Sequence, residues 1–154
     1  MDPFYGDPAR ARHLHDRTFK NYSRFIADLE QAINNQASAV MFYRALEPLA
    51  PAAYRDFIEH ARKDEMVHVQ MFQKLHRRLT GTESLAKPGR TEFSSYKQGV
   101  EIAFRGELEA AEMYRDMYLS TRVQKVRDVL FRAMTDEMEH AQRFGFLYFL
   151  PDRS

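Results

Sequence analysis

One short motif occurs twice in the chain, and it constrains the fold more than any other feature. Residues 63–68 read KDEMVH and residues 135–140 read TDEMEH, so Asp-Glu-Met-x-His recurs. A Glu and a His three positions apart share one face of a helix. A single copy is more often an exposed charge pair than a functional site. Two copies at mid-helix favour an interior site shared by two similar halves of the chain.

Four segments have the apolar periodicity of amphipathic helices. Apolar residues recur in each at spacings of three and four, and the strand alternative fails on period. Pro48, Pro51 and Pro88 fall between the segments, so the segment interiors contain no helix breaker. The predicted helices are residues 18–47, 51–80, about 95–119 and 122–149.

Residues at the segment ends predict where these helices start and stop. Pro51 suits the first position of the second helix, where its missing N–H is harmless, and Gly81 suits the end of that helix. Hydroxyl side chains are expected to cap the other two helices: Ser94 or Ser95 the third, and Ser120 or Thr121 the fourth.

The lengths of the connections restrict the topology. The first two and the last two helices are joined by very short connections, which predict antiparallel hairpins. Residues 81–93 can reach roughly 43–47 Å when extended, and a helix of about 30 residues is about 45 Å long. We therefore expect an all-α, antiparallel four-helix bundle with one long crossover between helices 2 and 3. An up-down-up-down bundle with a loose loop remains the alternative.

Composition limits the class of protein. Lys and Arg number 23 against 22 Asp and Glu, so the chain has no charge excess for binding nucleic acid. No apolar stretch is long enough for a membrane span, and the sequence starts without an apolar leader. The absence of cysteine leaves only carboxylates and imidazoles as metal ligands. We expect a soluble, cytoplasmic protein with one domain over residues 18–150 and a flexible N-terminal arm over residues 1–17.

The repeat extends beyond the motif itself. Residues 36–43, QASAVMFY, align with residues 107–114, ELEAAEMY, at nearly the same offset. Glu107 lies near the middle of the third helix, and the equivalent residue of the first helix is Gln36. Each is followed seven residues later by a tyrosine, Tyr43 or Tyr114.

With these motifs, residues 22–149 resemble the ferritin-like di-iron or di-manganese carboxylate proteins, most closely the stand-alone rubrerythrin-like branch. The resemblance implies a metal-dependent oxidoreductase that uses iron or manganese with hydrogen peroxide or dioxygen, as a peroxidase, ferroxidase or catalase-like enzyme. It also implies a metal site between the four helices, with one or two ions per chain. Carried over by position, the implied ligands are Gln36, Glu65, His68, Glu107, Glu137 and His140.

Three features depart from that family. Without cysteine there is no rubredoxin-type iron site, so electrons would come from an external donor. Ala110 stands where redox-switching rubrerythrins carry a further Glu, so their ligand exchange is unavailable. Gln36 replaces a carboxylate, so three Glu would face two divalent ions and leave a net charge of +1 in the core. We expect one tight and one weak or empty ion site.

A non-catalytic alternative follows from the same glutamine. A degenerate site could keep the fold as a structural or interaction module without metal. The retention of both D-E-x-x-H motifs argues against it, because unpaired carboxylates and imidazoles in a bundle core would be costly.

Several further residues have a predicted role around the site. Asp64 is expected to accept from His140, and Asp136 from His68, which would fix the imidazole tautomers. Tyr43 and Tyr114 either hydrogen-bond the ligand carboxylates or are plain core aromatics. The other four histidines, His13, His15, His60 and His76, are predicted not to be ligands.

The end of the chain is unusually apolar. Residues 143–154 read RFGFLYFLPDRS. Its apolar side chains cover most of a helix circumference and predict docking on a partner subunit, as in a homodimer, or on the N-terminal arm. These residues are Phe144, Phe146, Leu147, Phe149 and Leu150.

Overall fold

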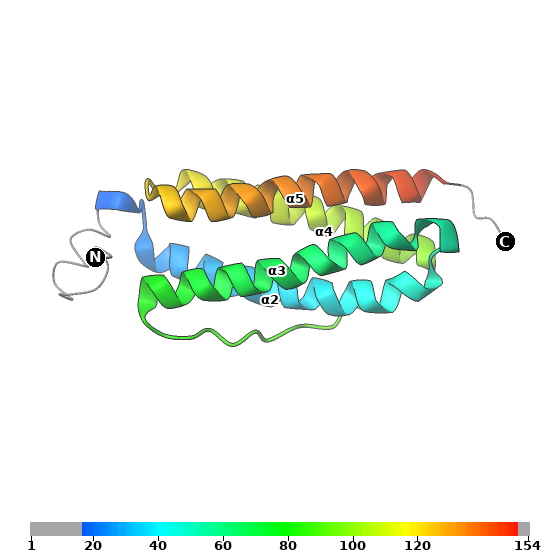
Figure 1. The fold of residues 1–154 in the computed structure, drawn as a ribbon, viewed down its shortest axis with the longest axis horizontal. Coiled ribbons are helices and arrows are strands. Elements are labelled where there is room, and N and C mark those ends of the chain that lie inside the picture. The colour runs from blue at the N-terminus through cyan, green and yellow to red at the C-terminus, as the bar shows by residue number, and fades with distance from the viewer. Residues whose placement is uncertain (1–16, 151–154) are drawn as a thin grey trace.

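The computed structural model describes residues 17–150 and confirms the all-α fold. Within that range it contains four long helices and two 3-10 turns (Figure 1). The helices are α2 (Tyr22–Leu46), α3 (Arg55–Thr80), α4 (Tyr96–Leu119) and α5 (Gln124–Phe149), and the turns are η1 (Glu47–Leu49) and η2 (Ala52–Tyr54). The predicted arm lies outside the described residues, apart from Arg17.

The four helices form a bundle of two antiparallel hairpins, α2 with α3 and α4 with α5 (Figure 1). The segment between α3 and α4 runs back along the outside of the bundle, as predicted for the long crossover (Figure 1). Side chains of α2 hold it in place: Asn34 accepts from the backbone N–H of Lys87 at 2.7 Å, and Ser38 accepts from that of Gly89 at 2.8 Å. The crossover is therefore a docked strap along α2.

Helix α2 starts later than predicted, at Tyr22 instead of residue 18. Asn21 caps it, because its side-chain oxygen accepts from the backbone N–H of Arg24 at 2.9 Å. Phe19 forms an antiparallel bridge with Thr121 instead of a helical turn. Tertiary pairing with the α4–α5 connection outweighs helix periodicity at this point.

The starts of α3 and α5 also differ from the prediction. The segment after Pro51 forms the 3-10 turn η2 before α3 begins at Arg55. Helix α5 begins at Gln124 without a side-chain cap, because the residue at its cap position is Val123, which has no polar side-chain atom. The Thr121 hydroxyl instead accepts from the Val123 backbone N–H and donates to the backbone oxygen of Thr18, both at 3.2 Å. Two predicted ends are confirmed: Ser95 caps α4, and α3 ends at Gly81 with φ +77°, the left-handed conformation that glycine adopts readily.

The core consists of two apolar layers with a polar layer between them. One apolar layer lies toward the start of α2 and includes Phe25, Leu29, Ile33, Phe72 and Leu130. The other lies toward the end of α2 and includes Leu46, Ile58, Val100, Phe144 and Leu147. Between them along every helix lie buried polar side chains, and this middle layer forms the candidate site.

The apolar end of α5 is only partly available for docking. Phe144 and Leu147 are buried in the protein's own core, so the prediction that they dock on another surface is wrong. Helical periodicity places them inward while Phe146 and Phe149 point outward, with exposures of 49% and 85%. A homodimer through this end stays a prediction. None of the helices in the described part of the chain is long and apolar enough to span a bilayer.

Candidate metal centre

All six residues predicted as ligands are buried and lie in the polar middle layer. Each helix supplies its share: α2 supplies Gln36, α4 supplies Glu107, and α3 and α5 each supply a Glu and a His. The Glu and His of each motif are three residues apart, so both side chains enter the bundle from one helix face. The six residues are Gln36, Glu65, His68, Glu107, Glu137 and His140, each at most 3% exposed.

His140 lies beside three carboxylates. Its Nδ1 is 3.2 Å from Glu137 Oε2, 3.3 Å from Glu65 Oε1 and 3.6 Å from Glu107 Oε1. One possible ligand atom from each of these four residues lies within 4.8 Å of the others. Carboxylate oxygens and imidazole nitrogens at such spacing could hold a metal ion.

His68 approaches the same carboxylates from α3. Its Nδ1 lies 3.2 Å from Glu65 Oε2 and 3.3 Å from Glu137 Oε1. Glu65 and Glu137 therefore lie between the two imidazoles, each beside both His68 and His140. Both histidines direct Nδ1, and not Nε2, toward the carboxylates.

The outer nitrogen of each imidazole contacts an aspartate of the opposite hairpin. His140 Nε2 lies 3.0 Å from Asp64 Oδ2, and His68 Nε2 lies 2.9 Å from Asp136 Oδ2. These are the two contacts that the repeat predicts. A carboxylate at Nε2 favours the tautomer with its proton there, which leaves Nδ1 as the nitrogen able to bind a cation. The role of the aspartates toward a metal stays a prediction.

Both predicted tyrosines are buried and hydrogen-bonded in the polar layer. The Tyr43 hydroxyl donates to Glu107 Oε1, and the Tyr114 hydroxyl accepts from the Gln36 amide. Burial, followed by the charge of nearby glutamates, raises the pKa of both tyrosines well above the usual range. Both phenols therefore stay protonated at neutral pH.

Gln36 is held by its nitrogen and has a free oxygen. Its Nε2 donates to Tyr114 and, at 2.7 Å, to Glu137 Oε1. The amide nitrogen must face Glu137, because a carboxylate oxygen needs a donor. Gln36 Oε1 is buried without a hydrogen-bond partner, and Glu65 Oε1 is buried with only the 3.3 Å contact to His140 Nδ1. Buried polar atoms are normally satisfied, so these two oxygens have acceptor capacity that a cation would use.

Without a cation the cluster retains protons. Burial and the neighbouring Glu137 raise the pKa of Glu107 to about 8. Burial lowers the pKa of His68, but its hydrogen bonds to Glu137 and Glu65 outweigh burial and raise the pKa to about 11. The pKa of His140 is raised in the same way, chiefly by its hydrogen bonds to Glu107 and Glu137 against the effect of burial. Binding a metal ion must therefore release protons from the imidazoles.

The sequence did not predict two residues that contact the aspartates from the side away from the imidazoles' carboxylate cluster, His60 and Arg132. Asp64 Oδ2 lies 3.0 Å from Nε2 of His60, while Asp136 Oδ2 lies 3.9 Å from Nε of Arg132. His60 and Arg132 each lie four residues before their aspartate, a helical spacing that could have revealed both contacts. His60 was predicted not to be a ligand, but it forms a second group with Asp64 and His140 whose possible ligand atoms lie within 4.8 Å of one another. His76 contacts Thr82 and Glu30 outside the cluster.

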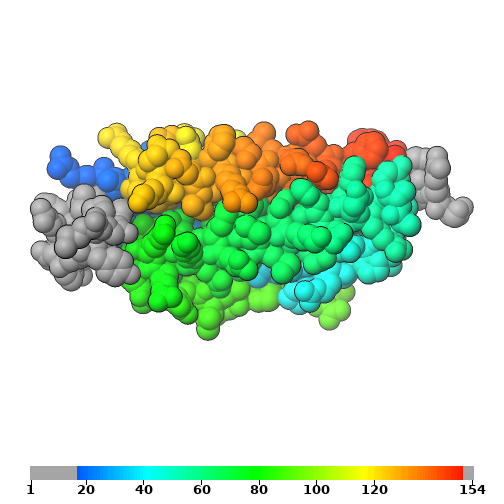
Figure 2. Space-filling model, in the orientation of Figure 1, coloured from blue at the N-terminus to red at the C-terminus, as the bar shows by residue number. Residues whose placement is uncertain are grey.

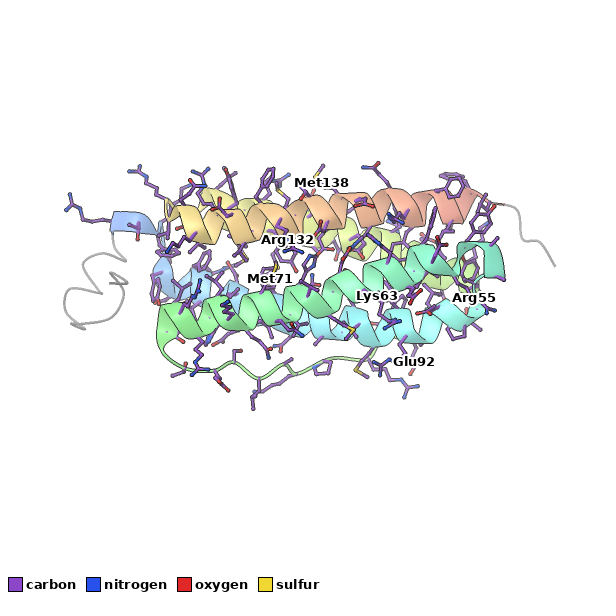
Figure 3. The ribbon with its side chains drawn as sticks, viewed as in Figure 1. Arg55, Lys63, Met71, Glu92, Arg132 and Met138 are labelled. Carbon is purple, nitrogen blue, oxygen red and sulfur yellow. The ribbon has the colours of Figure 1, made fainter. Side chains whose placement is uncertain are left out.

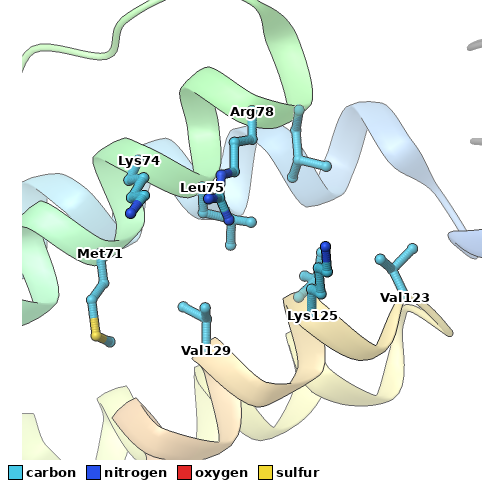
Figure 4. A pocket seen from close by; sticks show the side chains of 9 residues that line it. Met71, Lys74, Leu75, Arg78, Val123, Lys125 and Val129 are labelled. Carbon is cyan, nitrogen blue, oxygen red and sulfur yellow. The ribbon is translucent and has the colours of Figure 1, made fainter. Parts of the chain in front are cut away.

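A pocket of about 480 Å³ leads to the cluster between α2 and α4. Gln36, Glu65 and Glu107 lie in its wall, together with Phe42, Ile102 and Met113. A second pocket, of about 230 Å³, lies between the end of α3 and the start of α5 (Figure 4). Apolar and cationic residues line the second pocket, among them Lys74, Arg78 and Lys125, so it contains no metal-binding carboxylate or imidazole.

Solved structures share this fold. A conserved hypothetical protein, Rv2844, from Mycobacterium tuberculosis has a TM-score of 0.75 at 18% identity, over 86% of this chain and 96% of that protein. A hypothetical protein from Pyrococcus furiosus has a TM-score of 0.73 at 18% identity, over 80% of this chain and 87% of that protein. At this identity the likeness shows the fold alone.

Sequence comparisons identify the family. The chain is 34% identical to the uncharacterized protein YhjR of Bacillus subtilis (strain 168) over 129 residues. The aligned residues cover 83% of this chain and 88% of that protein. The rubrerythrin family model matches residues 28–148, the part of the chain that holds all four helices' buried polar residues. The chain therefore belongs to the rubrerythrin family, with its ferritin-like fold.

Proposed function

We propose that the protein is a metal-dependent oxidoreductase whose polar layer holds iron or manganese and reacts with hydrogen peroxide or dioxygen. One observation carries the proposal: the carboxylates Glu65, Glu107 and Glu137 converge with an imidazole in a fully buried cluster. The bound ions would supply the change of oxidation state that such chemistry needs. A separate protein or small molecule would supply electrons, since the chain has no cysteine for a rubredoxin-type site.

The burial of this cluster supports a cation. Each ionised carboxylate that leaves water requires a partner, and the penalty for an unpaired buried charge is several kcal/mol. The imidazoles compensate part of this charge when protonated. Divalent cations would compensate it more fully and would also use the buried Oε1 atoms of Gln36 and Glu65.

The surrounding residues would position the ligands. Asp64 and Asp136 hold the imidazoles by Nε2, so that Nδ1 of each faces the carboxylates. Tyr43 holds Glu107 by its hydroxyl proton. On the opposite side, Gln36 offers a neutral amide oxygen, a weaker donor for a hard cation than a carboxylate. The expected result is one tightly held ion and a second one held weakly.

The test is anaerobic loading with Fe(II) or Mn(II), followed by addition of hydrogen peroxide or dioxygen. The measurements are metal per chain, absorbance change of the metal and consumption of the oxidant. Glu65→Ala should abolish metal binding. In the presence of metal its Tm should therefore be lower than that of wild type, because metal at 100 times its Kd adds about 3 kcal/mol to the free energy of unfolding. Glu59→Ala, on the exposed face of the same helix, should behave as wild type.

Unchanged metal content in Glu65→Ala would contradict the site. Metal binding without any reaction toward either oxidant would contradict the redox chemistry and leave a metal-binding protein.

The second candidate is a structural or interaction module without metal. One observation favours it: the Gln36 amide nitrogen already donates to Tyr114 and to Glu137 by hydrogen bonds that need no ion. This candidate predicts that a strong chelator changes neither the Tm nor any partner binding. A fall in Tm on chelation would exclude it.

A further inference from the structure

The pocket between α2 and α4 is larger than the oxidants considered above require. Its volume is about 480 Å³, within the range of about 300–1,000 Å³ for small-molecule sites. A water molecule occupies about 30 Å³ in the liquid, so the pocket holds far more than one peroxide or dioxygen molecule. The size of the pocket suits an organic molecule.

Apolar groups form the walls of this pocket. Phe42 and Ala39 line it from α2, and Ile102, Ala110 and Met113 line it from α4. Thr91 of the crossover lies along one side, so the strap that docks on α2 also borders the pocket. An apolar body would gain from burial against these side chains at roughly 25 cal/mol per Å².

Gly106 lines the pocket from α4. It lies inside α4 with a helical φ, where glycine is unfavourable compared with alanine, and it is exposed. A Cβ at this position would meet no atom within 4 Å, so packing does not require glycine. Gly99 of the same helix differs, because a Cβ there would lie 2.5 Å from Leu46 Cδ1. Close packing therefore explains Gly99, whereas Gly106 faces open space beside the pocket.

The inner wall of the pocket offers acceptors. Gln36 lines it, is 3% exposed and has an unpartnered Oε1. The carboxylates Glu65 and Glu107 line it beside Gln36. A head group that donates an O–H complements these three residues, whereas a carboxylate head would meet charges of its own sign.

We propose that the pocket binds an organic hydroperoxide with an apolar body, and also the alcohol formed from it: at the metal centre the O–O bond would break to give the alcohol and water, with two protons from solvent and two electrons from the external donor. The apolar body lies between Phe42 and Met113, and the O–H group reaches the acceptors at the inner wall. The chemical role rests on the proposed function, whereas binding itself depends on the pocket and on oxygens of Gln36, Glu65 and Glu107 that the ions would share.

The test uses 2-phenyl-2-propanol, which has an apolar body and one O–H group. Its binding to the full chain is followed by backbone amide NMR shifts, with its methyl ether as the matched ligand without the donor. We expect a millimolar or tighter Kd and shifts centred on Ile102, Ala110 and Met113. The ether should bind at least tenfold more weakly.

Three variants locate the site. Gly106→Phe should place a ring at the pocket and weaken binding of the alcohol at least tenfold. Ala110→Phe should have the same effect from a second position, and it replaces the first variant if that one folds poorly. Leu108→Phe is the matched control on the same helix, because Leu108 is outside the pocket and already exposed. No binding to wild type, equal binding of the ether, or equal loss in Leu108→Phe would overturn the proposal.

Metal content measured on the same samples separates the two proposals. Alcohol binding by a chain that never takes up iron or manganese would contradict the proposed redox function while supporting the pocket. A loaded, peroxide-reactive chain that binds no alcohol would contradict the pocket alone.

Discussion

The two hairpins of the bundle place equivalent residues at the same height and differ at one decisive position. In α2–α3 the motif residues are Glu65 and His68, and in α4–α5 they are Glu137 and His140. Figure 2 shows α3 and α5, which carry the two motifs, side by side on one face. The remaining helices differ, since α4 offers a carboxylate where α2 offers the amide of Gln36.

That difference reverses one hydrogen bond. Tyr43 of the first hairpin donates its hydroxyl proton to Glu107 of the second. At the equivalent place, Gln36 donates to the hydroxyl oxygen of Tyr114. The amide thus turns its nitrogen inward to Tyr114 and Glu137, where a carboxylate would present acceptors. The site is symmetric in shape and asymmetric in charge.

A second difference lies behind the aspartates. His60 stands behind Asp64 in the first hairpin, and Arg132 stands behind Asp136 in the second. Arg132 lies on α5 on the side toward α3, and the half-exposed Met138 lies on the outer side of α5 (Figure 3). A histidine therefore contacts the aspartate of one imidazole–aspartate pair, and an arginine contacts that of the other.

The largest expected effect comes from making the second hairpin resemble the first. Glu107→Gln would leave two carboxylates for the metal, and we expect metal affinity to fall more than 100-fold, equivalent to about 3 kcal/mol. The metal-free protein should keep its Tm within a few degrees, because glutamine can still accept from Tyr43 and removes a carboxyl whose pKa is raised by burial. Calorimetric titration with Mn(II) and thermal unfolding measure both quantities. Tight binding by this variant would show that the asymmetry is irrelevant.

Loss of one supporting aspartate should have a smaller effect. Asp64→Asn and Asp136→Asn each remove the charge beside an imidazole Nε2, and contacts of this kind contribute about 10–100-fold in metal affinity. Because Asp136 supports His68 and Asp64 supports His140, the two variants should weaken binding to a similar degree. Asp56→Asn, at the start of α3 and distant from the motif, is the control. If metal affinity changes as little as in the control, the aspartates do not support the metal ligands.

Making the first hairpin resemble the second should strengthen the weaker ion site. Gln36→Glu would supply a fourth carboxylate, so two divalent ions would be balanced in charge. We expect about tenfold tighter binding of the second ion, together with a lower Tm of the metal-free protein, because the added carboxylate is buried among others. A titration that shows the same stoichiometry and affinity as wild type would support the structural module instead.

The metal-free protein should lose stability as pH rises above neutrality. His68 has a pKa of about 11 in the folded protein against 6.5 for the ordinary group, so its contribution is complete below pH 6.5 and is lost as pH rises toward 11. Glu107, with a raised pKa of about 8, adds a loss between pH 4.5 and 8. Each extra proton held by the folded state changes stability by about 1.4 kcal/mol per pH unit. Unfolding in urea from pH 6.5 to 8.5 measures the slope, and a rise in stability over this range would contradict the protonated cluster.

Much of the fold could be predicted from periodicity, because helix interiors depend on local pattern. The crossover followed from chain length, and the burial of Glu65 and Glu137 followed from the repeated motif. The starts of α2 and α5 were wrong because Phe19 and Thr121 pair across the chain, a contact that no local pattern records.

The site was only partly predictable for the same reason. Spacing brings Glu65, His68 and their equivalents to one helix face, and the aspartate contacts followed from the repeat. The orientation of the Gln36 amide depends on Glu137, which is 101 residues away in sequence. The pocket beside Gly106 depends on how α2 and α4 are placed, so a single glycine in the sequence gave no indication of it.

The most direct test of the central claim is the metal content of untagged protein after anaerobic loading, measured by inductively coupled plasma mass spectrometry in wild type and in Gln36→Glu. Three carboxylates beside one amide predict about one tightly held ion per wild-type chain and about two per chain of the variant. Absence of bound metal in both proteins would contradict the metal centre. Two tightly held ions in wild type would contradict the role assigned to Gln36.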